Sequence, residues 1–246
     1  MHVGKSYKLP EFLAWTRRTI YVLIVLSVTP VALYQLAGLK WLAIPWGIVF
    51  LLGATVALSA GFKNAQAYNR LQEALQVWES IVASSRMWGA MCRDYVADTD
   101  HARQLVYRHL AWLAALRHQM RDVKAWETMG QAQNVEYQRR YAIPEREQTL
   151  ESELIRYLPS GETDEVLMSN SRALRVLALQ SRQMNKLLAD GSLTTQQFGE
   201  FQATVRQLIE EQSHSERIKN FPFPRQHAFI NSLFVRILCI LLPFSM

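Results

Sequence analysis

The chain has 246 residues, of which 50% are hydrophobic, and its formal net charge at pH 7 is +6. Its two cysteines, Cys92 and Cys239, form no CxxC motif, which argues against a disulfide framework or a thiolate metal site. The basic residues form no cluster interleaved with aromatic residues, so a nucleic-acid partner is not expected.

Three apolar runs are long enough to cross a membrane. Residues 20–39 and 41–62 carry no charged side chain, and residues 226–246 carry only Arg236. A hydrocarbon core of ~30 Å needs about 20 helical residues, because each residue rises ~1.5 Å. The sequence predicts an N-terminal segment with two transmembrane helices (1–62), a helical region (63–225) and a third transmembrane helix (226–246). We expect the chain to stop before a fourth.

The distribution of basic residues predicts the orientation of these helices. Basic residues flank the expected cytoplasmic ends, namely Lys5, Lys8, Arg17, Arg18, Lys63, Arg70, Arg217, Lys219 and Arg225. The loop between the first two apolar runs holds only Lys40. Because positive residues accumulate on the cytoplasmic side, we expect the N-terminus and residues 63–225 to lie in the cytoplasm of a multi-pass membrane protein.

The region between the second and third apolar runs shows helical periodicity. Apolar residues continue at steps of three and four from residue 63 to about 96, so the second transmembrane helix is predicted to continue beyond the membrane. Asp98-Thr99-Asp100 offers a cap for a helix over 101–120, and Pro144 is typical of a helix start. Residues 159–165 are predicted as a loop. Two further helices are expected over 169–191, ending at Gly191, and from Thr194 or Thr195 onward. No alternating strand pattern occurs, so the fold class is all-α.

One stripe of the second apolar run has two possible explanations. Ala54, Leu58 and Phe62 are spaced four apart and share one helix face, which Gly47 and Leu51 extend. The stripe can pack against other membrane helices, as small residues elsewhere on the same helix allow. Alternatively, several copies of the helix surround an axis, so that the three side chains form apolar rings that gate a pore by dewetting.

The stretch GFKNAQAYNRLQEALQVWESIVASSR (residues 61–86) resembles the bestrophin family. Its matching residues are Gly61, Phe62, Asn64, Tyr68, Arg70, Glu73, Ala74, Trp78, Ser85 and Arg86. SERIKNFPFPRQ (215–226) and LLPF (241–244) resemble later parts of the family pattern. Lys63 and Ala65 depart from it, because the family usually has arginine and asparagine there. Arg236 stands where the family usually has an aromatic or apolar residue, and an arginine inside a membrane helix is a candidate functional residue.

The resemblance implies an assembly and two constrictions. It implies a homopentameric ring around one ion pore, in the inner membrane of a bacterium, with each subunit's transmembrane helices continuous with a cytoplasmic helical bundle. Ala54, Leu58 and Phe62 would form the pore neck. A second constriction, at the cytoplasmic exit, would fall on Gln197, or on Gln196 if the register differs by one residue. Conduction of small monovalent ions is implied, with cations slightly favoured and anions such as chloride possible. No cofactor is expected, and the sequence identifies no gating signal.

Two other functional classes remain as alternatives. An enzyme is not expected, because the six histidines have no metal-binding spacing and no nucleophile elbow or phosphate loop is present. A membrane-anchored helical scaffold or sensor without a pore would also explain the apolar runs and the helical region. The number of subunits distinguishes these alternatives, since a pore between subunits needs a ring.

Overall fold

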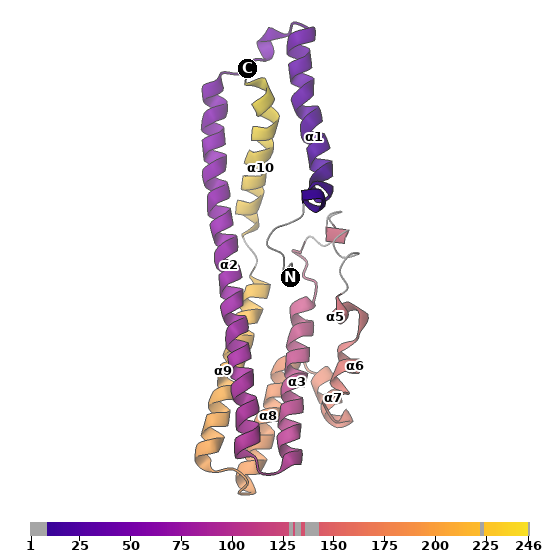
Figure 1. Cartoon of the computed structure of the whole chain (residues 1–246), viewed down its shortest axis with the longest axis vertical. Helices are drawn as coiled ribbons and strands as arrows, with labels where there is room; N and C mark the ends of the chain where they lie inside the picture. The colour runs from indigo at the N-terminus through magenta and orange to yellow at the C-terminus, as the bar shows by residue number, and fades with distance from the viewer. Residues whose placement is uncertain (1–8, 128–129, 131–133, 136–142, 222–223, 246) are drawn as a thin grey trace. The chain divides into compact units, whose positions relative to one another are not determined.

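The computed structural model describes residues 9–127, 130, 134–135, 143–221 and 224–245 of the chain. Within these residues, every regular element is a helix (Figure 1). The prediction of an all-α fold is therefore confirmed. The chain divides into two compact units. We call Met1–Asn69 with Phe223–Met246 the membrane unit, and Arg70–Pro222 the bundle unit.

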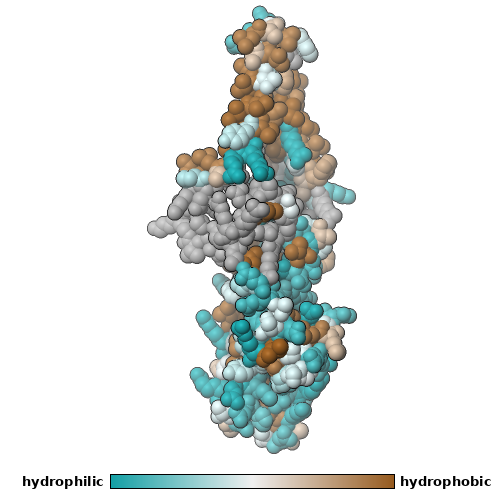
Figure 2. All heavy atoms as spheres, turned by 90° about the vertical axis from the view of Figure 1, so that its right-hand side faces the viewer, coloured by the Kyte–Doolittle hydropathy of each residue, from teal (hydrophilic) through white to brown (hydrophobic). Residues whose placement is uncertain are grey.

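Among the described residues, three helices are long and apolar enough to cross a membrane, and all three have their apolar parts in the membrane unit. They are α1 (Leu9–Leu36), the first part of α2 (Trp46–Tyr95) and α10 (Arg225–Leu241). Two short 3₁₀ helices, η1 (Lys40–Leu42) and η2 (Leu242–Phe244), complete the unit. The backbone N–H of Ile44 donates to the Phe244 carbonyl at 2.8 Å, which ties the segment before α2 to the end of the chain. Figure 2 shows hydrophobic residues covering most of one face of these helices.

The positive charge of the protein belongs to the membrane unit. Its sequence holds eight lysine and arginine residues but only one acidic residue, Glu11. The bundle unit holds nineteen basic and twenty acidic residues, so its charges nearly cancel. The basic pI of the whole chain therefore reflects the membrane-associated segments rather than the helical bundle.

In the described part of the bundle unit, the rest of α2 packs with further helices. These are α3 (Thr99–Arg121), α5 (Pro144–Glu147), α6 (Leu150–Leu154), α7 (Ser160–Leu167), α8 (Arg172–Ala189) and α9 (Thr195–Asn220). Large side chains from α2, α3, α8 and α9 fill its core, including Trp88, Trp112, Leu105, Leu177, Phe201 and Leu208. Trp88 and Phe201 meet edge to face, with ring centroids 5.2 Å apart.

Several predicted helix ends are confirmed. The Asp98 carboxylate accepts hydrogen bonds from the backbone N–H groups of Asp100 and His101, and so caps α3. Helix α8 ends where Gly191 adopts a φ of 73°, and the N–H of Ser192 then bonds back to the Leu187 carbonyl. This pattern satisfies carbonyls that have no partner within the helix.

The prediction of a loop over 159–165 is wrong, because these residues form most of α7. Pro159 occupies the N-cap position of α7, and Glu162 lies in its first turn, where a negative charge is favourable. Thr163 and Val166 are buried against the bundle. Tertiary packing therefore stabilises a segment whose glycine and polar residues indicate a turn when read alone.

Candidate functional site

The stripe formed by Ala54, Leu58 and Phe62 lies exposed on α2. Leu58 and Phe62 each expose 64% of their surface, and Ala54 is also exposed. At about 100° per residue, these positions occupy one side of the helix. Phe62, at one edge of this side, also lines a pocket with residues at the start of α10. The exposed stripe is available to lipid, to another copy of the chain, or to water.

The opposite side of α2 packs against the membrane unit itself. Its half-buried residues are Leu52, Gly53, Val56, Ser59 and Ala60. A Cβ added at Gly53 would lie 3.9 Å from a Leu238 methyl group, which shows how closely α10 approaches there. The Ser59 hydroxyl donates a hydrogen bond to the side-chain oxygen of Asn231 on α10. Small residues thus serve close helix packing on one side of α2, while the predicted neck residues occupy the other.

Two residues of the family-like signature connect α2 to the end of α9. The Arg70 guanidinium donates a hydrogen bond to the backbone carbonyl of Ile218, one of the last carbonyls of α9. Such carbonyls have no partner within their helix, so a cation placed there is favourable. Glu73, one turn further along α2, forms an ion pair with Arg217. These contacts give Arg70 and Glu73 a structural role within the bundle unit.

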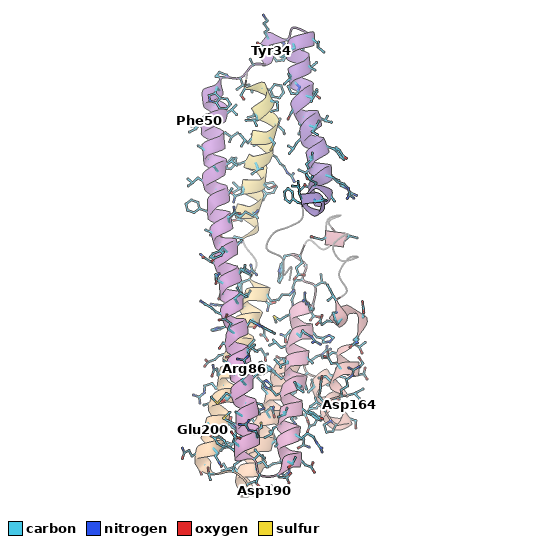
Figure 3. All side chains as sticks on the ribbon, in the orientation of Figure 1. Tyr34, Phe50, Arg86, Asp164, Asp190 and Glu200 are labelled. Atoms are coloured by element: carbon cyan, nitrogen blue, oxygen red, sulfur yellow. The ribbon has the colours of Figure 1, made fainter. Side chains whose placement is uncertain are left out.

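The other signature residues are mostly exposed. Exposed side chains at signature positions are Lys63, Asn64, Tyr68, Trp78 and Arg86, and a Cβ at Gly61 would meet no neighbouring atom. Trp78 is 61% exposed although it is large and apolar. Figure 3 shows Arg86 further along the same helix. The fold of a single chain therefore does not require most of these side chains.

Gln197, the predicted exit-constriction residue, takes part in the N-terminal cap of α9. The backbone N–H of Thr194 donates to Gln197 Oε1 at 2.9 Å, and the Gln197 N–H donates to Thr194 Oγ1 at 3.3 Å. Together these bonds form a capping box. Gln197 is half-buried, whereas Gln196 is exposed. The carbonyl oxygen of the Gln197 amide thus already has a local partner.

A buried histidine in the bundle was not predicted from the sequence. His109 lies between the rings of Trp88 and Trp112, and its Nε2 is 2.9 Å from the Ser85 hydroxyl. Burial lowers the pKa of His109 to about 4, because the charged imidazolium would lose its hydration. The ring is therefore neutral at physiological pH.

The bundle also contains a buried carboxylate that no sequence pattern indicates. Glu211 on α9 is 5% exposed, and its Oε1 accepts hydrogen bonds from Ser80 and Ser84 at 2.6 and 2.8 Å. Its Oε2 has no partner among the described residues. Two adjacent glutamates, Glu210 and Glu211, are typical of a solvated surface, but only Glu210 is exposed. No group of three or more His, Cys, Asp or Glu side chains in the described parts of the chain could hold a metal ion.

The membrane unit contains a pocket of about 320 Å³ where α2 meets the start of α10. It is lined by Ser59, Phe62, Lys63, Gln66, Pro224, His227 and Asn231. The polar residues of α10 are a sequence signal for such a pocket. The pocket itself forms only because α10 packs beside α2 and brings the lining residues of both helices together. Arg236 lies elsewhere on α10, is exposed, and has no hydrogen-bond or ion-pair partner within the described residues. Its role stays a prediction.

Comparison with known proteins identifies the family. The model of the family described as bacterial and fungal bestrophin proteins matches residues 13–246. The chain belongs to the bestrophin family. The resemblance of residues 61–86 to a bestrophin signature is thus confirmed over nearly the whole chain. The fold of the chain is similar to that of a bacterial bestrophin homologue from Klebsiella pneumoniae. Its comparison with crystal structures of two variants of that protein gives TM-scores of 0.78 and 0.73, at 23% and 22% sequence identity. The matches cover 94% and 95% of this chain, and 77% and 76% of those chains.

Two bacterial relatives of this bestrophin are longer than the part that the chain matches. The chain is 24% identical over 213 residues to proteins of Escherichia coli K12 and Salmonella typhi. Both relatives are named voltage-dependent anion channel-forming protein YneE. The match covers 87% of this chain but 61% of the length of each relative. The likeness therefore concerns a major part of those proteins rather than their whole length.

Proposed function

We propose that this bestrophin is an ion channel, formed by five copies of the chain around a central axis. The observation that carries the proposal is the position of Ala54, Leu58 and Phe62 on α2. Ala54 and Leu58 lie on the side opposite the one that packs against α10 within the protomer, and Phe62 lies at the edge of that side, beside the pocket shared with α10. A ring of such helices places three apolar layers around one axis, and layers of this kind gate ions by dewetting.

The family membership favours a channel over the two alternatives. A scaffold could be anchored by the same helices and would expose the same apolar stripe to lipid, so the family membership decides between the two. An enzyme would need a constellation of reactive side chains, and the buried polar groups His109 and Glu211 are enclosed in the bundle. The relatives named as anion channel-forming proteins support the same choice.

The sign of the permeating ion is a separate part of the proposal. We propose small monovalent ions, for which an apolar neck sets a dehydration barrier without selecting a charge. The bacterial branch slightly favours cations, whereas the name of the relatives and the positive excess of the membrane unit favour anions. Groups near the mouths of the pore must then decide selectivity.

Purified protein reconstituted in liposomes tests both parts. We expect a particle mass of five chains after correction for detergent, and a chloride or sodium flux above that of protein-free liposomes. Reversal potentials in planar bilayers under a potassium chloride gradient then give the sign of the permeating ion. A monomeric mass would overturn the pentamer, and the absence of flux would overturn the channel and favour the scaffold.

A further inference from the structure

The pocket between α2 and the start of α10 is lined by both apolar and polar side chains. Phe62 and Pro224 are the apolar ones. Ser59, Lys63, Gln66, His227 and Asn231 supply the polar groups. All of these residues belong to the membrane unit. A volume of about 320 Å³ is enough for a small polar group of several heavy atoms.

The charge of the pocket selects an anion. Its two ionisable side chains, Lys63 and His227, are both of basic type. The ammonium group of Lys63 is exposed, and it has no ion-pair partner among the described residues. No acidic residue occurs in α10 or in α2 before Glu73. An anion in this pocket would therefore meet a positive charge without a competing carboxylate.

The neutral polar groups of the pocket can act as hydrogen-bond donors. Because Ser59 donates to the Asn231 oxygen, the amide nitrogen of Asn231 is left as a donor. That nitrogen has no acceptor within the described part of the chain. Gln66 is exposed and brings a second amide. Two amide N–H₂ groups and an ammonium match a group with several acceptor oxygens, such as a phosphate.

The position of the pocket along α2 indicates where such a phosphate would come from. Phe62 is the last residue of an uncharged run, and Lys63 is the first charged residue after it. This boundary is where the head groups of a bilayer meet its hydrocarbon core. Exposed apolar side chains of α10, including Phe229, Ile230 and Leu233, continue from the pocket along the membrane-length helix. A lipid could thus place its phosphate in the pocket and its acyl chains along α10.

We propose that the pocket binds the phosphate-bearing head group of an anionic membrane lipid, with Lys63 as counter-ion and Asn231 and Gln66 as donors. Phosphatidylglycerol and phosphatidylcholine with the same acyl chains are suitable probes, because both carry a phosphate but only the first has a net charge. The full chain is purified in a neutral detergent, and retained lipid is measured by native mass spectrometry during titration. The midpoint of thermal unfolding at each lipid concentration is a second measurement.

We expect tighter binding of phosphatidylglycerol than of phosphatidylcholine by the parent protein. Lys63→Gln should weaken phosphatidylglycerol binding about fivefold, the effect typical of one basic residue near an anionic membrane surface. Lys63→Arg keeps the charge and should bind like the parent. Asn231→Asp adds a negative charge inside the pocket and should also weaken binding. Lys40→Gln is the matched control, since Lys40 is an exposed lysine of the same unit outside the pocket.

Three outcomes would overturn this assignment. Equal retention of the two lipids would exclude selection of an anionic head group. An equal loss in Lys40→Gln and Lys63→Gln would mean that overall charge, not the pocket, governs binding. If inorganic phosphate raises the midpoint of thermal unfolding as much as phosphatidylglycerol does, the pocket is a site for a free anion. Lipid retention is measured without ion flux, so its result is independent of the channel proposal.

Discussion

The Arg70 guanidinium donates a hydrogen bond to the backbone carbonyl of Ile218, and thereby joins α2 to the last turn of α9. Arg70→Ala should lower the stability of the bundle unit by roughly 1.5–3 kcal/mol, the usual range for a hydrogen bond to a charged group. The loss arises because the Ile218 carbonyl is left without a partner. Chemical denaturation, followed by the fluorescence of the buried Trp88 and Trp112, measures it.

Arg86→Ala provides the control for Arg70→Ala. Arg86 is an exposed arginine on the same helix, so its loss should change stability by less than ~0.5 kcal/mol. Glu73→Gln should also have a small effect, below ~1 kcal/mol, because the Glu73–Arg217 pair is partly exposed to solvent. If Arg70→Ala behaves like Arg86→Ala, the contact with Ile218 does not contribute to stability.

The neck proposal predicts a difference between two equally exposed phenylalanines on α2. Phe62 and Phe50 are both 64% exposed, but Phe62 belongs to the predicted neck, whereas Phe50 lies four residues before Ala54, one turn outside it (Figure 3 labels Phe50). Phe62→Ala should widen and wet the neck and so raise ion flux into liposomes. Phe50→Ala should leave the flux near that of the parent. Equal effects of the two substitutions would remove the distinction on which the neck proposal depends.

The other two neck residues give predictions of opposite sign. Leu58→Ala should raise flux, by less than Phe62→Ala, because a smaller side chain is removed. Ala54→Phe should lower flux, since it narrows the predicted ring. Ala57→Phe introduces the same side chain at an exposed position outside the stripe and serves as its control. Flux that is unchanged in all three stripe variants would identify these residues as ordinary lipid-facing or packing positions.

The capping box changes how variants of Gln197 must be interpreted. Gln197→Glu preserves an oxygen that can accept the hydrogen bond from the Thr194 N–H, and it adds a negative charge. If Gln197 rings the cytoplasmic exit, this variant should shift the reversal potential toward cation selectivity. Gln197→Ile should lower conductance with little change in selectivity, but it also removes half of the cap.

Thr194→Ala separates the two effects of Gln197→Ile. It removes the other half of the same cap, at a cost of about 1 kcal/mol, while the residue at 197 is unchanged. We expect conductance like that of the parent. If Thr194→Ala and Gln197→Ile lower conductance equally, the cap of α9 explains the effect. If the variants of Gln197 and of Gln196 leave both conductance and reversal potential unchanged, neither residue lines the exit.

Burial of His109 predicts a pH-dependent stability of the bundle. Because the pKa of about 4 in the folded protein lies below the ordinary value of 6.5, the unfolded chain binds the proton first as the pH falls. The stability should therefore be independent of this group above about pH 6.5. It should decline from there toward pH 4, by about 3 kcal/mol in total.

Unfolding free energies between pH 7.5 and 5.5 measure the slope before most carboxylates titrate. His109→Gln should remove the slope, although it lowers stability at every pH because the packing against Trp88 and Trp112 is lost. His214→Gln, at an exposed position of α9, should retain it. A slope of the same size in His109→Gln and in the parent would show that another group is responsible.

Local features of the fold could be predicted from the sequence, and long-range ones could not. The cap at Asp98 and the end of α8 at Gly191 depend on residues adjacent in the chain, so their patterns were readable. The spacing Thr194-x-x-Gln197 is itself a capping-box pattern and was open to the same analysis. In contrast, α7 contains Thr163 and Val166, which are buried by tertiary packing, and Glu162, which forms an ion pair with Arg108 of α3. No pattern within residues 159–165 contains that information.

The same division applies to the candidate site. The stripe of Ala54, Leu58 and Phe62 follows from helical periodicity, and the sequence alone places the three residues on one face. That this face is exposed depends on α10 covering the opposite side, through contacts such as that of Ser59 with Asn231. Burial of Glu211 likewise requires Ser80 and Ser84 from another helix. Adjacent glutamates usually indicate a solvated surface, so the sequence predicts exposure of Glu211 rather than burial.

The limited contact among the membrane helices has a consequence for how the protein loses structure. Only 6%, 6% and 0% of the residues in the three membrane-length windows are buried inside the protomer. Each of these helices satisfies its own backbone hydrogen bonds, so it does not need the others to remain helical in an apolar environment. Heating in detergent should therefore melt the bundle cooperatively and leave a plateau of residual far-ultraviolet ellipticity. The calorimetric enthalpy per residue of the whole chain should accordingly fall below that of a water-soluble helical protein of equal length.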